Sequence, residues 1–89
     1  MALFSDENLK ENIEPIDGAL EKVNLINGVT WDWKEGGADA GVIAQEVEKV
    51  LPEAVFENNG VKMVNYGALI GLQMAAINEL QEKLEAKDA

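Results

Sequence analysis

The chain has 89 residues, 17 of them acidic and 7 basic, with no cysteine, no histidine and a formal net charge of −10. This length fits one small domain, and a domain of this size often needs oligomerisation to supplement its limited core. The composition excludes disulfides and nucleophiles paired with histidine, and the acidic charge disfavours a nucleic acid partner.

The first segment, residues 5–16, is polar with isolated apolar side chains. Pro15 disfavours a helical conformation at the residue before it, so we expect a turn or a short helix here. A first main helix is expected after Asp17, a candidate N-cap, and Asn27-Gly28 predicts its end. The apolar positions of this helix follow helical spacing at Ala19, Leu20, Val23 and Ile26.

Residues 29–34 alternate between apolar and polar side chains, which is typical of a strand. Trp31 and Trp33 then lie on the same side of that strand, where packing in the core or at a subunit interface is the expected role. The following segment with Gly36-Gly37 is interpreted as a flexible connection. A second main helix is expected next and ends at Pro52, with apolar positions at Val42, Ile43, Val47, Val50 and Leu51.

Residues 54–57 and 61–64 are predicted to form a hairpin, because Asn59-Gly60 between them tolerates the backbone of a tight turn. From Tyr66 to the end the chain is rich in helix formers and has no proline. We therefore expect an α+β single domain with short strands that include a hairpin, two main helices and a long C-terminal helix.

The C-terminal helix contains a short heptad pattern. Ile70, Ile77 and Leu84 are seven residues apart and Leu80 occupies an intervening core position, but Gln73 interrupts the pattern one heptad earlier. Periodicity alone leaves open whether this helix packs on its own domain or in a coiled coil. In the coiled-coil interpretation these four apolar residues form the interface of a homotrimer.

Ser5 and Lys10 are the candidate pair for covalent chemistry. A lysine acts as a general base when burial favours its neutral form, and a serine needs such a base to become a nucleophile. Spacing alone favours a different reading, in which Ser5 is a helix N-cap followed by Asp6 and Glu7 in the first turn. No metal or cofactor site is indicated, and no signal peptide or apolar run of about 20 residues points to a membrane.

Four blocks of the sequence, in order, resemble the self-cleaving intramolecular chaperone domains found at the C-termini of phage tailspikes, tail fibres and endosialidases. The first block, residues 5–13, is similar to the family signature Ser-Asp-x-x-Leu-Lys-x-Asn-Ile. The other blocks are residues 29–34, residues 41–47 with 51–55, and residues 64–69 with 79–80. The resemblance thus covers nearly the whole chain after Phe4.

The resemblance implies a domain that trimerises, brings three upstream fibre or spike chains into register, and releases itself by cutting the Phe4–Ser5 bond. Ser5 would be the nucleophile and Lys10 its general base, with Asn12 as a possible supporting group or only a polar turn residue. Residues 1–4 would be the end of an upstream fibre segment or an added leader, and residues 5–89 the domain. The expected partners are two further copies and the upstream part of the same polypeptide, with assembly in the host cytoplasm.

Two other interpretations stay open at this stage. A trimerisation module without covalent chemistry would make Ser5 a simple cap, whereas an acidic adaptor would bind a partner helix through the apolar face of its own terminal helix. Similar self-cleaving domains also occur outside phages, in a membrane-bound transcription factor. The resemblance therefore indicates the operation more closely than the biological setting.

Overall fold

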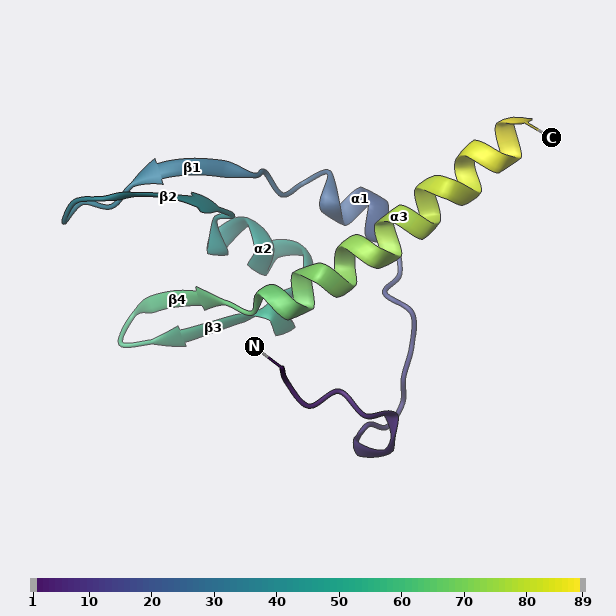
Figure 1. Ribbon diagram of the computed structural model, residues 1–89, viewed down its shortest axis with the longest axis horizontal. Helices are drawn as coiled ribbons and strands as arrows, with labels where there is room; N and C mark the ends of the chain where they lie inside the picture. The colour runs from purple at the N-terminus through teal and green to yellow at the C-terminus, as the bar shows by residue number, and fades with distance from the viewer. Residues whose placement is uncertain (1, 89) are drawn as a thin grey trace.

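Two antiparallel hairpins and a long C-terminal helix make up most of the protein (Figure 1). The computed structural model describes residues 2–88. The elements in chain order are the 3-10 helix η1 (Glu7–Leu9), α1 (Ala19–Val23), β1 (Val29–Asp32), β2 (Ala38–Gly41), α2 (Ala44–Val50), the 3-10 helix η2 (Pro52–Ala54), β3 (Val55–Asn58), β4 (Val61–Val64) and α3 (Tyr66–Asp88). This content confirms the predicted α+β class, while the homotrimer stays a prediction.

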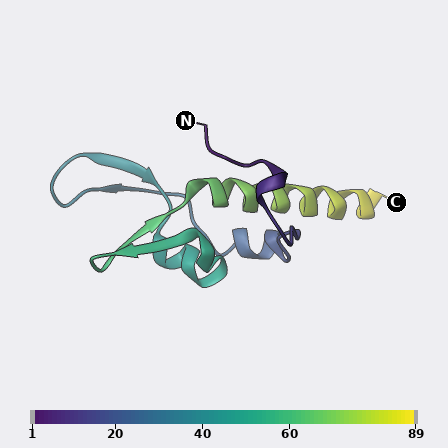
Figure 2. The same ribbon diagram turned by 90° about the horizontal axis from the view of Figure 1, so that it is seen from below.

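The molecule is elongated, with principal extents of 53, 34 and 24 Å. The two hairpins project in one direction from the region where α3 begins, and α3 extends in the opposite direction (Figure 1). In the view of Figure 1, the segment before α1 extends away below α3, whereas α1 lies along its upper side; Figure 2 shows the same segment crossing α3 before it reaches α1. This placement separates the N-terminal residues from the packed part of the domain.

The predicted hairpin is confirmed as β3 and β4. Its first strand begins one residue later than predicted, at Val55. Val55 pairs with Val64 at its base, and Asn58 pairs with Val61 beside the turn. Asn59 and Gly60 have φ angles of 53° and 78°, the left-handed conformation that a two-residue turn requires. The predicted second main helix and the C-terminal helix are also present, as α2 and α3, but α2 begins at Ala44, so Val42 and Ile43 lie before it and not within it as predicted.

The Gly36-Gly37 segment, which was interpreted as a flexible connection, is the turn of a second hairpin that the sequence did not predict. Gly36 and Gly37 have φ angles of 110° and 92°, and the Trp33 N–H donates to the Gly37 carbonyl across the turn at 2.8 Å. The strand that follows, β2, pairs with β1 from Val29 opposite Gly41 onward. Strand β2 was not predicted because it contains only alanine, aspartate and glycine.

The first helix is shorter than predicted, and Asp17 does not cap it. α1 ends at Val23, and separate hydrogen-bonded turns continue the chain to Ile26. Its N-cap is Gly18, which has no side chain to accept a bond from the helix. Instead, the Ala19 N–H donates to the Glu79 carboxylate of α3 at 2.6 Å. The Glu79 carboxylate, 60 residues away in the sequence, thus accepts the hydrogen bond that a local N-cap side chain usually accepts.

The core is small and lies where α1, α2, η2 and α3 meet. In the described part of the chain, its buried side chains are Ala19, Val47, Leu51, Ala54, Leu69, Leu72 and Ala76. Leu72 and Val47 are the largest of those that are almost fully buried. Since only a few large side chains are buried, each one carries a large share of the stability of the fold.

We expect Leu72→Ala to lower the free energy of unfolding by about 3 kcal/mol, because the substitution removes a buried side chain and leaves a cavity. Chemical denaturation followed by circular dichroism measures this loss. Leu25→Ala is the matched control, since Leu25 is 61% exposed. It should change the stability by less than about 0.5 kcal/mol. Equal effects of the two substitutions would contradict the described core.

Candidate active site

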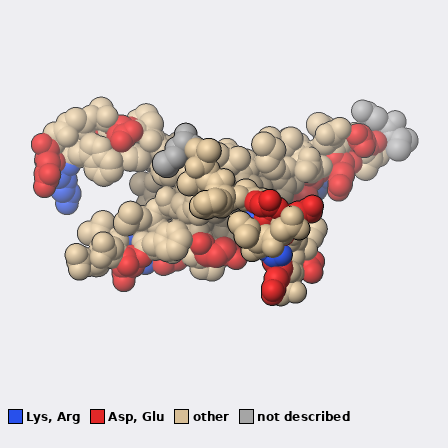
Figure 3. All heavy atoms as spheres, turned by 60° about the horizontal axis from the view of Figure 1, so that its bottom comes forward, with Lys and Arg blue, Asp and Glu red and all other residues tan. Residues whose placement is uncertain are grey.

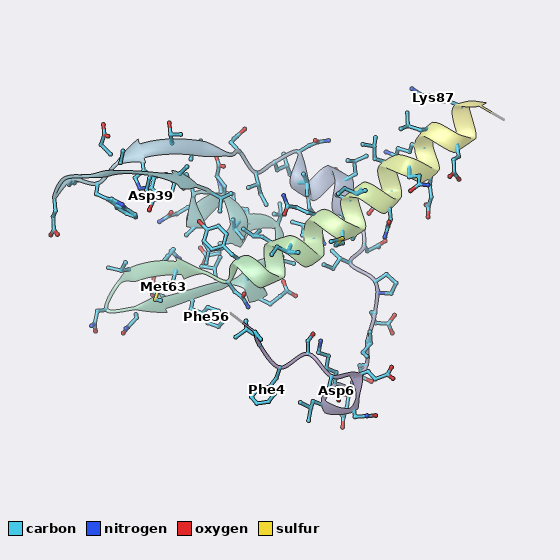
Figure 4. The ribbon with its side chains drawn as sticks, in the orientation of Figure 1. Phe4, Asp6, Asp39, Phe56, Met63 and Lys87 are labelled. Atoms are coloured by element: carbon cyan, nitrogen blue, oxygen red, sulfur yellow. The ribbon has the colours of Figure 1, made fainter. Side chains whose placement is uncertain are left out.

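The N-terminal arm, defined as residues 2–15, stands apart from the core, and each of its residues is exposed. Phe4 and Asp6 both lie on this arm, well away from the hairpins and α3 (Figure 4). The chain first becomes partly buried at Ile16, just before α1. Met1 and Ala89, the outer ends of the predicted leader 1–4 and domain 5–89, lie outside the described residues.

One tight turn organises the middle of the arm. Asp6 is the N-cap of η1, and its carboxylate accepts a hydrogen bond from the Asn8 N–H at 2.9 Å. The Leu9 and Lys10 N–H groups donate to the carbonyls of Asp6 and Glu7. Asp6 therefore stabilises this short helix as Asp commonly does at an N-cap, because its side chain accepts a hydrogen bond from a backbone N–H that has no partner within the helix. The cap is Asp6 rather than Ser5, so the alternative reading of Ser5 as the cap is wrong.

The turn brings Ser5 and Lys10 together. The Lys10 ammonium donates a hydrogen bond to the Ser5 hydroxyl, with 2.7 Å between Nζ and Oγ. Both side chains are exposed. The distance is within the range that proton transfer between a nucleophile and its base requires. Solvation, however, favours the charged form of an amine, so this arrangement has the geometry of a dyad without the burial that a base needs.

The residues next to Ser5 and Lys10 in the sequence are exposed as well. Phe4 is 96% exposed, so the Phe4–Ser5 peptide bond lies in an uncovered stretch of chain. Leu9, next to Lys10, is also exposed, as is Ile13 further along the arm. Apolar side chains at these positions are solvated in the single chain, and burying them would be favourable.

Asn12, the third residue named from the sequence, shapes the backbone of the arm. It has a φ angle of 53°, and asparagine is one of the few residues that adopt this left-handed conformation readily. Among the described residues, the hydrogen bonds to Ser5 and Lys10 do not involve the Asn12 side chain. The structure therefore brings Ser5 and Lys10 together but leaves the Asn12 amide outside the pair.

The apolar face of α3 is uncovered. The predicted interface residues Ile70, Ile77, Leu80 and Leu84 are all exposed, between 46% and 60%. Met74, which the sequence analysis did not include, belongs to the same face and is 62% exposed. Helical spacing from Ile70 would have identified it, because residues four apart lie side by side. A continuous apolar strip of this kind on a helix is typical of an interaction surface.

The hairpins carry two further apolar surfaces. Strand β1 ends at Asp32, so Trp31 lies within it and Trp33 directly after it, and their rings meet edge to face with centroids 5.2 Å apart. On the other hairpin, Phe56 and Met63 are direct cross-strand partners, and both are more than half exposed (Figure 4). This second pair was not predicted as a surface, although alternation along the two strands places both side chains on one face.

An ion pair attaches the second hairpin to α2. The Lys62 ammonium lies 2.8 Å from the Glu48 carboxylate and 3.6 Å from that of Glu57. The hydrogen bond to Glu48 raises the pKa of Lys62 above its usual 10.5. This contact fixes one face of the hairpin against the core and leaves the Phe56 face outward.

The described residues contain neither a helix that could span a membrane nor a cluster that could hold a metal ion. Within residues 2–88, no helix has both the length and the apolar composition needed to cross a bilayer. In the same part of the chain, no group of acidic side chains converges in a way that would hold a metal ion. Acidic side chains are spread over the surface instead, with wide uncharged areas between them on the face that Figure 3 presents.

Comparison with known proteins places this arrangement in a family. The profile described as "Chaperone of endosialidase" matches residues 5–56, more than half of the chain. The chain belongs to the chaperone of endosialidase family. The match begins at Ser5 and includes η1, both tryptophans and α2. The name of the profile also classes the family as a peptidase.

Long tail fibre proteins named Gp37 are similar to this chain. The protein of Enterobacteria phage K3 is 39% identical over 92 residues, which cover 91% of this chain and 7% of the relative. The protein of Escherichia phage AR1 is 39% identical over 87 residues, covering 84% of this chain and 8% of the relative. That of Salmonella phage S16 is 36% identical and covers 94% and 14%. This member of the chaperone of endosialidase family thus spans a small fraction of the relatives' length.

Proposed function

We propose that this chain is an intramolecular chaperone that trimerises an upstream phage tail fibre and then releases itself by cutting the Phe4–Ser5 bond. The observation that carries the proposal is the 2.7 Å hydrogen bond between Lys10 and Ser5, at the first residue of the family match. Support for a fibre partner comes from the relatives, which are named long tail fibre proteins. Assembly would occur in the host cytoplasm, and the fibre would enter the virion tail.

The geometry supports a reaction in which the nucleophile belongs to the bond that it cuts. With Lys10 neutral, its amine takes the proton of the Ser5 hydroxyl while Oγ attacks the carbonyl carbon of Phe4. The Ser5 nitrogen then leaves as an amine and receives that proton from Lys10. Phe4 is now joined to Ser5 Oγ by an ester. Water hydrolyses the ester, giving a carboxylate on Phe4 and restoring the Ser5 hydroxyl.

Trimerisation is supported by the uncovered apolar face of α3. Three copies related by a rotation axis would bury Ile70, Ile77 and Leu84 against one another, as in a short coiled coil. Holding three chains together at one end raises their effective concentration for the slow, long-range pairing of a fibre. Cleavage after assembly then leaves the fibre without the element that could reverse the process.

Burial explains why cleavage would wait for assembly. In the single chain the Lys10 side chain is exposed to solvent. An interface that covers the arm would favour the neutral amine and so activate the base. The chemistry would therefore begin only in a correctly assembled trimer.

The test is the intact mass of this domain fused behind a trimer-forming fibre segment. We expect the native fusion to split between Phe4 and Ser5, while Ser5→Ala and Lys10→Ala stay whole and trimeric. A native fusion that forms a trimer but stays whole would remove the catalytic assignment and favour a trimerisation module without covalent chemistry. A native fusion that stays monomeric would favour the acidic adaptor.

A further inference from the structure

A pocket of about 390 Å³ opens between α1 and the first half of α3. None of the side chains that line it is charged, although the protein as a whole is strongly acidic. The lining includes Val23, Ile26, Val42, Tyr66, Leu69 and Ile70. A concave, uncharged surface of this size suits apolar side chains from another segment.

The pocket adjoins the proposed trimer interface. Ile70 belongs to both surfaces, since it lines the pocket and lies on the apolar face of α3. A second copy that packs on this face would therefore bring its own exposed segments close to the pocket. In a rotational trimer each copy offers one surface to one neighbour and a different surface to the other.

The arm has apolar side chains that match such a pocket. Leu9 is 70% exposed and Ile13 is 66% exposed, and they stand on either side of Lys10 in the sequence. Leu9 and Ile13 are exposed rather than seated in the pocket of their own chain, and the arm extends away below α3 in the view of Figure 1, whereas α1 lies along its upper side. The arm of a neighbouring copy can approach the pocket from outside.

We propose that Leu9 and Ile13 of one copy dock in this pocket of a neighbouring copy, so that the active site is completed between subunits. The inference rests on the trimer and the cleavage proposed above. In this arrangement the uncharged pocket of the neighbouring copy is the surface that covers Lys10, the proposed base. A lysine buried against uncharged walls favours its neutral form, whereas a lysine covered by the acidic surface elsewhere would gain carboxylate partners and keep its charge.

Engineered cysteines test the contact directly, because the chain has no cysteine of its own. Two fusions with Ser5→Ala, which keeps them whole, carry Ile13→Cys or Val23→Cys, and one of them is isotope-labelled. After the two are assembled together and oxidised, we expect a mixed disulfide that joins one labelled and one unlabelled copy. Val61→Cys is the control in place of Val23→Cys. Val61 is exposed beside the turn of the β3–β4 hairpin, so it should form no mixed disulfide with Ile13→Cys.

The outcomes separate this inference from the proposed function. A trimer without the mixed disulfide would overturn the docking and leave the function standing, and a monomer would overturn both. A disulfide within one copy of the double variant Ile13→Cys/Val23→Cys would show that the arm folds back on its own chain, which also overturns the inference.

A rate measurement gives an independent readout in the fusion that retains Ser5. We expect Leu9→Asn to slow cleavage by roughly tenfold or more without changing the trimer, because it puts a polar group in the apolar pocket. Leu25→Asn, at an exposed position outside the pocket lining, should cut at the native rate. Equal rates for the two variants would contradict the docking.

Discussion

A fusion that carries Lys10→Arg is expected to form a trimer and stay uncut. Arginine keeps the positive charge and can still donate a hydrogen bond to the Ser5 hydroxyl, but it cannot give up its proton in a protein. The substitution therefore separates a lysine that merely holds Ser5 in place from a lysine that removes the Ser5 proton. If the lysine is the base, cleavage should slow by about 1,000-fold or more, because the groups of a catalytic unit act together and the loss of one removes most of the rate enhancement.

A time course of intact mass measures this effect on trimers isolated by size exclusion. Lys83→Arg is the matched control, because Lys83 is exposed on α3 and distant in sequence from the dyad. It should leave the rate unchanged. Cleavage of the Lys10→Arg fusion at the native rate would show that a fixed positive charge is sufficient, and the base would have to be another group.

Ile77→Asp is expected to abolish the trimer while leaving the fold of each copy intact. Ile77 is 60% exposed in the single chain, so a carboxylate there remains solvated. In a rotational trimer the same substitution brings three carboxylates into one apolar interface. Burial of an unpaired charge costs several kcal/mol per ion, so the concentration needed for assembly should rise by roughly 1,000-fold or more.

Sedimentation of the native and variant proteins over a range of concentrations checks this expectation. Asn78→Asp adds the same charge at the neighbouring exposed position of α3 and should assemble normally. Circular dichroism should show the same helix content for both variants. A trimeric Ile77→Asp protein would place the interface on another surface, such as the Phe56 and Met63 face of the second hairpin.

Much of the fold could be predicted because local signals agree with it. Asn59-Gly60 specifies the turn between β3 and β4 through backbone angles that few other residues adopt. Pro52 ends the helix before it, and the composition after Tyr66 favours a helix throughout. In each case the residues near the boundary determine the structure.

Strand β2 and the N-terminus of α1, which were predicted wrongly, are instead determined by contacts with other elements. Ala38–Gly41 has little strand propensity, and it is extended because it pairs with β1 across the turn at Gly36-Gly37. The start of α1 is served by Glu79, which comes close only after α3 has packed against α1. Contacts of this kind leave no local pattern in the sequence.

The candidate site, like the fold, could be predicted only in part. Ser5 and Lys10 could be named from the motif, and the turn at η1 brings their side chains within hydrogen-bond distance. The exposed state of both residues could not be predicted, because it follows from the position of the whole arm relative to the core. The pocket between α1 and α3 was not predicted either, since its walls come from three separate parts of the sequence.

The detached arm has a consequence for the way such domains spread among genes. The residues of the arm are exposed on both sides of the Phe4–Ser5 bond, so the packed domain places no demand on the sequence that comes before it. Under the proposed function, a recombination event that joins the coding region for residues 5–89 to a different trimeric protein would transfer the proposed assembly and cleavage activities in one step. The recipient protein would then need only a free C-terminal end and compatible symmetry.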